Sequence, residues 1–222
     1  MKSDKISLTQ TIYQYLWNEI STLHLAPGEK LSEVKLANDF NCSRIPVREA
    51  VHLLVADDAL MVKPQSGSFV TLIDLEKLAQ VRYLRETLES KIILDGFQEG
   101  KFSSIVPYLE SIIEKQRMLL NTRSFEAAFQ LDIQFHEIFY NLTDKNFVIE
   151  HTGENNIHYI RARLLSLQLE NPQEMPDQHE AIVRGIKNND FEALKIAVAD
   201  HLRNVNKVYK SDFSKVAEYI KA

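Results

Sequence analysis

Two short helical patterns joined by a tight connection constrain the fold of this chain more than any other feature. The first begins at Ser32 and ends near Phe40, and the second begins at Ser43 and ends near Asp58. Both serines can cap their helices, because a serine hydroxyl accepts an N–H of the first turn. Only residues 41–42 separate the two patterns. Two short helices connected so closely predict a helix-turn-helix.

A longer helix precedes this motif and a β-hairpin follows it. Residues 8–24 carry apolar side chains at helical spacing. Residues 60–64 and 69–72 are β-prone runs on either side of a polar turn that contains Gly67. A hairpin at this place forms the wing of a winged helix. We therefore predict that residues 1–72 form a winged helix-turn-helix domain.

The second helix of the motif begins with two arginines on one face. Arg44 and Arg48 lie four residues apart, so both side chains project from the same side of the first turns. Recognition helices present that face to base edges, and arginine pairs bidentately with guanine. Pro46 is tolerated there because first-turn amides have no partner within the helix. Taken alone, the octet at 43–50 also fits an ordinary amphipathic helix with two solvated arginines.

Three motifs occur in order in the first third of the chain. They are Leu-x-Pro-Gly-x-x-Leu-x-Glu-x-x-Leu-Ala at 25–37, Ser-Arg-x-Pro-Val-Arg-Glu-Ala at 43–50 and Gly-x-x-Val at 67–70. Together they resemble the winged helix of the GntR family of bacterial transcription regulators. The resemblance implies that Arg44 and Arg48 are the main DNA contacts. It also implies that Ser43 caps the helix near a phosphate and that Gly67 lets the wing approach the minor groove. We add Lys35, on the preceding short helix, as a further DNA contact.

Composition restricts where such a protein acts. The length of 222 residues suits one large domain or two smaller ones. A net charge of −5 excludes a broad basic surface, so DNA contact would depend on a local cationic face that dimerisation doubles. The single cysteine, Cys42, excludes an internal disulfide. Because the N-terminus lacks a signal-peptide core and no long apolar run occurs, we expect a cytoplasmic protein without a membrane segment.

Residues 73–222 are predicted to form a second, all-helical domain. The whole chain contains only 6 Gly and 6 Pro, which favours long helices and few loops. The expected helices are residues 74–98, 103–121, 124–141, 144–169, 176–188 and 190–219. No strand pattern recurs, so an antiparallel helical bundle follows. The predicted fold class is therefore mainly α, with a small β-hairpin wing in the N-terminal domain.

Four residues of this helical region have the chemistry of metal ligands. Asp132 and His136 lie four apart, so a carboxylate and an imidazole share one helix face. On their own they are more often a surface or capping pair. His179 and His201 are equally far from a turn around residue 190, so a helical hairpin would bring them level. Three histidines and one aspartate converging inside a bundle would bind a divalent cation such as Zn, Ni or Mn.

Short motifs around these residues carry a second resemblance. They are Asp-x-x-x-His at 132–136, His-x-x-Ile at 179–182 and His-Leu at 201–202. This pattern is similar to the FCD domain, the ligand-binding domain of FadR-type GntR regulators. The resemblance implies metal ligation by Asp132, His136, His179 and His201. It also implies that Arg85, in Arg-x-x-Leu-Glu, pairs with a carboxylate effector through its planar fork. The alternatives are that Arg85 forms a surface ion pair with Glu89, or that Arg82 holds the effector.

We therefore expect a transcription regulator that acts as a repressor and binds a palindromic double-stranded operator as a homodimer. A small carboxylic acid would complete an open position on the metal, pair with Arg85 and change operator affinity. Two alternatives remain at this stage. The three histidines and one carboxylate could serve an enzyme that activates water or oxygen, or the metal could be purely structural. The run at 161–163 is predicted to be a solvated face or a dimer contact.

Overall fold

The chain folds into two compact units. The structure is a computed structural model that describes residues 7–149, 156–169, 171–204 and 216–221. The first unit comprises residues 1–75 together with 214–222, and the second comprises residues 76–213. The sequence suggested one boundary after residue 72. The structure adds that the C-terminal segment belongs with the first unit, a long-range association that no local sequence pattern encodes.

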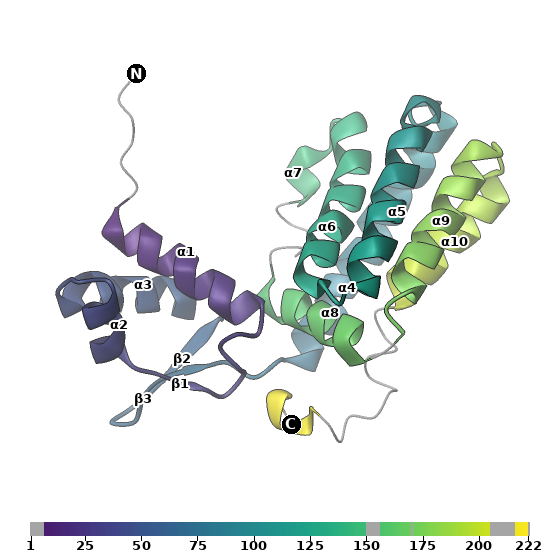
Figure 1. Ribbon diagram of the computed structural model, residues 1–222. Coiled ribbons are helices and arrows are strands. Elements are labelled where there is room, and N and C mark those ends of the chain that lie inside the picture. The colour runs from purple at the N-terminus through teal and green to yellow at the C-terminus, as the bar shows by residue number, and fades with distance from the viewer. Residues whose placement is uncertain (1–6, 150–155, 170, 205–215, 222) are drawn as a thin grey trace. The chain divides into compact units, whose positions relative to one another are not determined.

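The first unit has the predicted winged helix-turn-helix fold (Figure 1). Its elements are α1 (Leu8–Ser21), β1 (Lys30–Leu31), α2 (Glu33–Asp39), α3 (Arg44–Ala56), β2 (Leu60–Lys63) and β3 (Gly67–Val70). The strands form an antiparallel sheet in the order β1-β3-β2. Met61 lies opposite Phe69 in the hairpin. The connection between α2 and α3 is as short as predicted, and β1 adds a strand that the sequence did not indicate.

Serine residues stand at the N-caps of the first three helices. The Ser7 hydroxyl accepts from the backbone N–H of Gln10 at 3.1 Å, and the Ser32 hydroxyl accepts from that of Lys35 at 3.2 Å. Ser43 has the extended backbone of an N-cap residue, but its side chain makes no capping hydrogen bond. The expectation that this hydroxyl caps α3 is therefore wrong. The backbone conformation alone begins the helix, and the exposed hydroxyl does not satisfy a first-turn amide.

The core of the first unit lies between α1 and α3. Its fully buried apolar residues are Ile12, Leu16 and Ile20 of α1 and Val47, Ala50 and Leu54 of α3. Leu53, the residue before Leu54, is 43% exposed. The stripe of α3 that faces α1 recurs every three to four residues, and Leu53 lies beside that stripe. The recognition helix is thus fixed by one face while its first turn stays open.

The C-terminal segment closes one end of the first unit. The backbone N–H of Ile73 donates to Tyr219 O at 2.8 Å, and that of Lys221 donates to Ile73 O at 2.9 Å. These bonds form a parallel bridge between Ile73 and Ile220. Lys221 Nζ also lies 2.8 Å from a carboxylate oxygen of Asp74. The last described residues therefore hold the stretch that leads directly into the next helix.

The regular elements among the described residues of the second unit are all helices, as predicted. It contains α4 (Leu75–Gln98), η1 (Ser103–Ile105), α5 (Val106–Asn121), α6 (Phe125–Leu142), α7 (Asn146–Ile149), α8 (Ile157–Leu169), α9 (Glu174–Lys187) and α10 (Phe191–Asn204). Within it α5 packs against α6 and α9, and α9 packs against α10 (Figure 1). None of the helices described is long and apolar enough to cross a bilayer.

Two of the predicted helices differ in the structure. The expected helix at 144–169 corresponds to α7 and α8, and residues 150–155 lie outside the described residues. The expected helix at 190–219 corresponds to α10 and a short 3-10 turn, η4 (Ala217–Tyr219), with residues 205–215 outside the described residues. The hairpin turn between α9 and α10 lies where the sequence placed it, around residue 190.

Close packing fixes the α9–α10 hairpin. A Cβ built on Gly185 would lie 2.8 Å from Cα of Leu194, so only glycine lets the two helices approach this closely. Leu194 is fully buried, and so are Phe135 and Phe139 of α6. These residues belong to one apolar core shared by α4, α5, α6, α9 and α10. The helices that carry the candidate metal ligands are thus held by a common core.

Candidate metal centre and DNA-reading face

Three helices bring the four candidate ligands together. Asp132 and His136 lie on α6, His179 on α9 and His201 on α10, and all four are at most 4% exposed. One ligand atom from each residue lies within 4.8 Å of all the others. Asp132 and His136 share one helix face, and His179 and His201 face each other across one helical hairpin, as their spacing in the sequence predicted. The structure therefore has a buried cluster of one carboxylate and three imidazoles.

The distances within this cluster suit a shared ion. Nε2 of His201 lies 3.1 Å from Nε2 of His136. Oδ1 of Asp132 lies 3.4 Å from Nε2 of His179 and 3.8 Å from Nε2 of His136. Two nitrogen or oxygen ligands about 2.1 Å from one ion, at tetrahedral or octahedral angles, lie about 3.0–3.4 Å apart. Two of these three separations fall within that range and the third is longer, and the four ligand atoms all lie within 4.8 Å of one another.

Each histidine ring is oriented by an oxygen atom on its far side. Nδ1 contacts a carboxylate oxygen of Glu89 in His136, the amide oxygen of Gln116 in His179 at 3.0 Å and that of Gln178 in His201 at 3.0 Å. Such oxygens accept hydrogen bonds, so each ring carries its proton on Nδ1 and presents the Nε2 lone pair to the cluster. No sequence pattern predicted that these three acceptors orient the histidine rings.

Burial and charge favour the metal-binding protonation state at three of the four candidate ligands. Burial lowers the pKa of His179 to about 4, and it also lowers the pKa of His201. For Asp132, burial alone would raise the pKa, but the charge of Arg163 and the neighbouring histidines hold it well below its usual range. Neutral imidazoles and an ionised carboxylate are the forms that bind metal.

One atom of the cluster is conspicuous as an unused ligand. Nε2 of His179 is buried and makes no hydrogen bond to any of the described residues. Its ionic contact is Oδ1 of Asp132 at 3.4 Å, and a buried nitrogen without a hydrogen bond costs free energy that a metal bond would recover. With the distances, tautomers and charges described above, this atom shows that the residues present could hold a divalent cation.

Arg85 is buried beside the cluster. Its Nε donates to Glu89 Oε2 at 2.9 Å, and its Nη1 donates to the hydroxyl oxygen of Tyr159. The ion pair with Glu89 that we considered as an alternative is present, but it is buried rather than on the surface, with side chains 4% and 0% exposed. Burial would raise the pKa of Glu89, but Arg85 and His136 lower it to about 2. The carboxylate therefore stays ionised.

A small void connects Arg85 with the metal cluster. Its volume is about 10 Å³, and its walls are Arg85, Phe129, Asp132, Ile133, His136 and Tyr159. A void of that size holds about one water molecule. Arg82, the rival candidate, does not line it. Arg85 thus shares a cavity with two of the four candidate metal ligands.

Arg163 is a second buried guanidinium at the cluster. Its Nη2 donates to both carboxylate oxygens of Asp132, at 3.1 and 3.2 Å, and the residue is 8% exposed. Arg161, two residues earlier, is fully buried. The prediction that residues 161–163 form a solvated face is therefore wrong. A guanidinium can be buried when a carboxylate pairs with it. Here that carboxylate is 31 residues away in the chain, so no local sequence pattern indicates the pairing.

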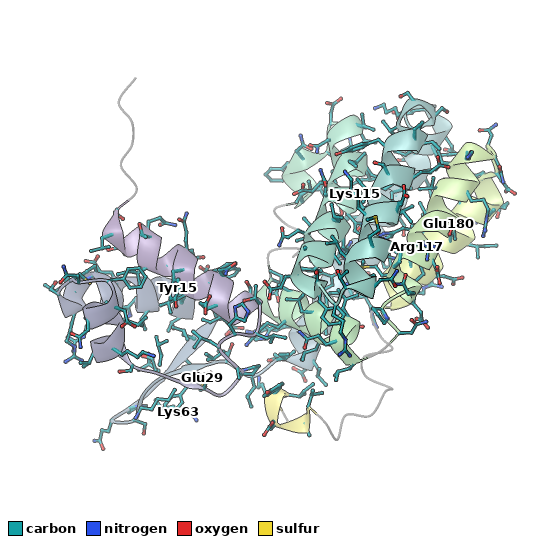
Figure 2. The ribbon with its side chains drawn as sticks, viewed as in Figure 1. Tyr15, Glu29, Lys63, Lys115, Arg117 and Glu180 are labelled. Atoms are coloured by element: carbon teal, nitrogen blue, oxygen red, sulfur yellow. The ribbon has the colours of Figure 1, made fainter. Side chains whose placement is uncertain are left out.

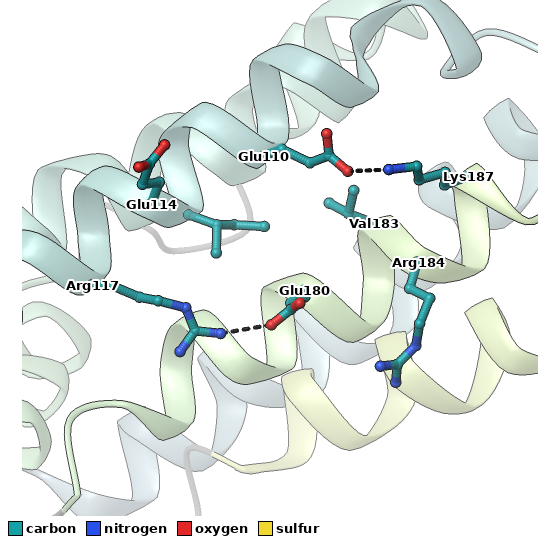
Figure 3. Close-up of a pocket in the computed structure, with 8 residues that line it drawn as sticks. Glu110, Glu114, Arg117, Glu180, Val183, Arg184 and Lys187 are labelled. Carbon is teal, nitrogen blue, oxygen red and sulfur yellow. Dashed lines mark hydrogen bonds and ion pairs between the residues drawn. The ribbon is translucent and has the colours of Figure 1, made fainter.

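A wider hollow lies elsewhere on the bundle, between α5 and α9 (Figure 3). Its volume is about 470 Å³. Charged side chains pair across it, Lys187 with Glu110 at 2.8 Å and Arg117 with Glu180 at 2.7 Å. Arg117 and Glu180 lie on neighbouring helices (Figure 2). No predicted site residue lines this hollow.

The predicted DNA-reading residues are exposed on the first unit. The side chains of Arg44 and Arg48 are 52% and 58% exposed. Both guanidinium groups approach the same oxygen of Glu33, at 3.5 and 3.2 Å. Lys35 is exposed on α2, and Gly67 has φ +105° at the wing turn, a conformation that favours glycine.

Comparisons with known proteins cover most of the chain. The family model described as "Bacterial regulatory proteins, gntR family" matches residues 8–70, and the model of the FCD domain matches residues 80–204. The HTH-type transcriptional repressor RspR of Escherichia coli K12 is 27% identical over 200 residues, which cover 90% of this chain and 87% of that protein. An uncharacterized HTH-type regulator of Streptomyces ambofaciens is 34% identical over 197 residues, covering 87% and 81%.

Solved structures show the same fold. McbR/YncC of E. coli superposes with a TM-score of 0.71 at 20% identity, covering 93% of this chain and 99% of that one. A transcriptional regulator from Rhodococcus sp. RHA1, described as putative and as GntR, gives a TM-score of 0.72 at 18% identity, covering 92% and 98%. Both structures combine the two parts found here, since each match spans nearly the whole of both chains.

Proposed function

This chain belongs to the GntR family of bacterial regulatory proteins and carries an FCD domain, and from that premise we propose that it is a repressor controlled by a small organic acid. As a member of the family it is a DNA-binding transcription regulator and not an enzyme. The acid, bound at the metal centre of the helical unit, sets operator affinity. The name of RspR as a repressor supports the direction of control.

The metal is held by Asp132, His136, His179 and His201. Zn, Ni and Mn each accept such a set of imidazoles and one carboxylate. When bound, the cation supplies a Lewis-acidic position for a carboxylate oxygen. The observation that supports this most strongly is the orientation of the three rings, because every Nδ1 contacts an oxygen acceptor and every Nε2 is left for the cluster.

Arg85 supplies the second contact to the acid. Its guanidinium is already inside the protein, so an entering carboxylate meets a planar donor fork in a low-dielectric environment. The small void that it shares with Asp132 and His136 marks where the acid would come closest to both groups. Tyr159 holds the same guanidinium from the other side, which keeps it from rotating away.

The winged helix reads the operator. Arg44 and Arg48 contact bases, Ser43 and Lys35 contact phosphates, and Gly67 brings the wing to the minor groove. A homodimer in the cytoplasm places one winged helix on each half of a palindrome. The acid changes operator affinity only if it binds the DNA-competent and DNA-incompetent states differently. A typical coupling of about 1–3 kcal/mol corresponds to roughly a 5–150-fold change.

Metal content and thermal stability test this proposal. We would purify the wild type, His179→Ala and the control His52→Ala, which removes an exposed histidine of α3. We expect near-stoichiometric metal in the wild type and the control and little in His179→Ala. We also expect one class of small carboxylic acids to raise the melting temperature of the two metal-bearing proteins only.

Three other outcomes are informative. A wild type without metal would refute the metal centre and the acid mechanism with it, and leave the DNA-binding assignment. Metal whose removal lowers the melting temperature, with no acid altering operator affinity, would make the ion purely structural. Metal retained by His179→Ala would place the ion elsewhere.

A further inference from the structure

We propose that Glu33 is a positioning residue of the DNA-reading face, which prepares Arg44 and Arg48 for base contact and reduces their attraction to non-specific DNA. The inference rests on the proposed base-reading role of the two arginines. It assigns a role to an acidic residue in a site that otherwise consists of cationic and small side chains.

The geometry joins two helices through one atom. Glu33 is the first residue of α2, and Arg44 is the first residue of α3. Oε2 of Glu33 lies 3.2 Å from Nε of Arg48 and 3.5 Å from Nη2 of Arg44. The first distance is a hydrogen bond, and the second is a long contact that acts mainly through charge. A single carboxylate oxygen therefore holds both arginine heads.

The atoms used by this contact leave the reading edge of Arg48 available. Glu33 accepts its hydrogen bond from Nε of Arg48, so the terminal nitrogens of the guanidinium are not needed for that bond. A fork of two N–H donors is what pairs with O6 and N7 of guanine. The contact with Glu33 is thus compatible with base reading. Because it restricts a long flexible side chain in advance, less rotamer freedom is lost when DNA binds.

The burial of the three side chains fits a supporting role for the acid. Glu33 is 22% exposed, whereas Arg44 is 52% and Arg48 is 58% exposed. The guanidinium groups are therefore the more accessible groups, and the carboxylate is the more protected one. Two positive charges share one negative charge, which weakens the attraction to phosphates that every DNA sequence offers. Base contact depends on geometry as well as charge, so it is weakened less than phosphate contact. The preference for specific over non-specific DNA therefore increases.

A structural role for Glu33 makes a different prediction. An acidic residue in the first turn of a helix is stabilised by the helix dipole, and Glu33 has that place in α2. If this were its whole role, replacing it would lower thermal stability and leave the discrimination between DNA sequences unchanged. The ratio of affinities for two duplexes therefore separates the two roles.

The experiment uses the full chain and two DNA probes. One is the duplex that the wild type selects from a randomised pool, and the other is a scrambled duplex of the same composition. We would compare wild type with Glu33→Gln, which keeps the shape of the side chain, and with Glu49→Gln as a matched control on α3. Glu49 accepts a hydrogen bond from Thr9 at 2.8 Å and is not paired with either arginine in the structure.

We expect Glu33→Gln to reduce the ratio of the two affinities by about three- to tenfold. The selected duplex should bind more weakly, and the scrambled duplex should bind equally or more tightly with a steeper salt dependence. Glu49→Gln should keep the wild-type ratio. A further variant, Glu33→Ala, removes the oxygen acceptor as well as the charge and should lower the ratio further than Glu33→Gln.

Arg48→Ala separates failure of this inference from failure of its premise. The variant should weaken binding to the selected duplex by about 5–150-fold. If it does not, the base-reading role of Arg48 is wrong. If it does, and Glu33→Gln keeps the wild-type ratio or weakens both duplexes equally, then Glu33 does not position the arginines and the inference is overturned.

Discussion

The arginines at the two candidate sites, one site in each unit of this chain, differ in their burial. In the first unit Arg44 and Arg48 are more than half exposed and share one acid. In the second unit Arg85 and Arg163 are at most 8% exposed, and each has its own carboxylate beside the metal cluster. Breaking an exposed ion pair costs little free energy, so Arg44 and Arg48 can exchange their acid for DNA. Breaking a buried ion pair costs much more free energy.

This difference matches the ligands that the two units are proposed to bind. DNA is too large to enter a protein, so its contacts must be presented on the surface with little to desolvate. A small acid can be enclosed, and in a low-dielectric interior one guanidinium and one cation bind it strongly. The comparison therefore predicts that charge-removing substitutions cost stability in the second unit and DNA specificity in the first.

Asp132→Asn should give the largest effect on stability. The substitution leaves Arg163 buried without its carboxylate, and breaking a buried pair costs about 3–5 kcal/mol. Glu33→Gln, which breaks the exposed contacts of the first unit, should cost less than about 1 kcal/mol. Denaturant unfolding of both variants in the presence of a chelator measures the difference. Equal losses would remove the contrast between the units.

Gln116→Ala should weaken metal binding without removing a ligand. Gln116 orients His179 through Nδ1, and loss of such a supporting contact typically costs about 10–100-fold in metal affinity. Competition with a chelator of known affinity measures the change. Gln134→Ala is the matched control, because Gln134 lies on α6 and bonds to the hydroxyl of Tyr108. An unchanged affinity in Gln116→Ala would mean that packing alone orients the ring.

Gly185→Ala should separate α9 from α10. The new methyl group would meet backbone atoms of Leu194 at 2.8–2.9 Å, and such overpacking costs about 2 kcal/mol. Because these helices carry His179 and His201, metal affinity should fall together with stability. Thermal unfolding with and without metal measures both effects. A loss of stability with intact metal affinity would show that the cluster tolerates a displacement of the hairpin.

Tyr13 makes a small, pH-dependent contribution to the free energy of unfolding of the first unit. Its hydroxyl donates to Asp57 at 2.6 Å, and burial together with this bond raises the pKa of the phenol. The folded state therefore retains the proton more tightly than the unfolded state, so the contribution is present below about pH 10 and is lost as the pH rises further. Tyr13→Phe should cost about 1 kcal/mol at pH 8. The difference in unfolding free energy between wild type and Tyr13→Phe should be smaller at pH 11. A difference that does not change with pH would contradict the stabilising role of the hydrogen bond to Asp57.

Local spacing explains what the sequence predicted well. The helix-turn-helix follows from two short helical patterns and a two-residue connection, and Arg44 and Arg48 are neighbours simply because they lie one turn apart. His179 and His201 could be paired because a hairpin places residues equidistant from its turn side by side. The structure contains the expected hairpin and brings both histidines to Asp132 and His136.

Tertiary contacts explain what the sequence did not predict. Glu89 and His136 are 47 residues apart, Gln116 and His179 are 63 apart, and no periodicity links such positions. The burial of Arg163 depends on Asp132 of another helix, so charge alone suggested the wrong environment. Local reasoning was also incomplete at Ser43, whose backbone adopts the capping conformation while its hydroxyl does not cap.

The most direct test of the whole account is the affinity of the metal-loaded protein for its selected duplex, with and without the acid that raises its melting temperature. We predict a change of about 5–150-fold in the wild type. No change is expected after chelation or in Arg85→Ala. An operator affinity that stays constant while the acid is bound at the metal centre would contradict the claim that this site controls the winged helix.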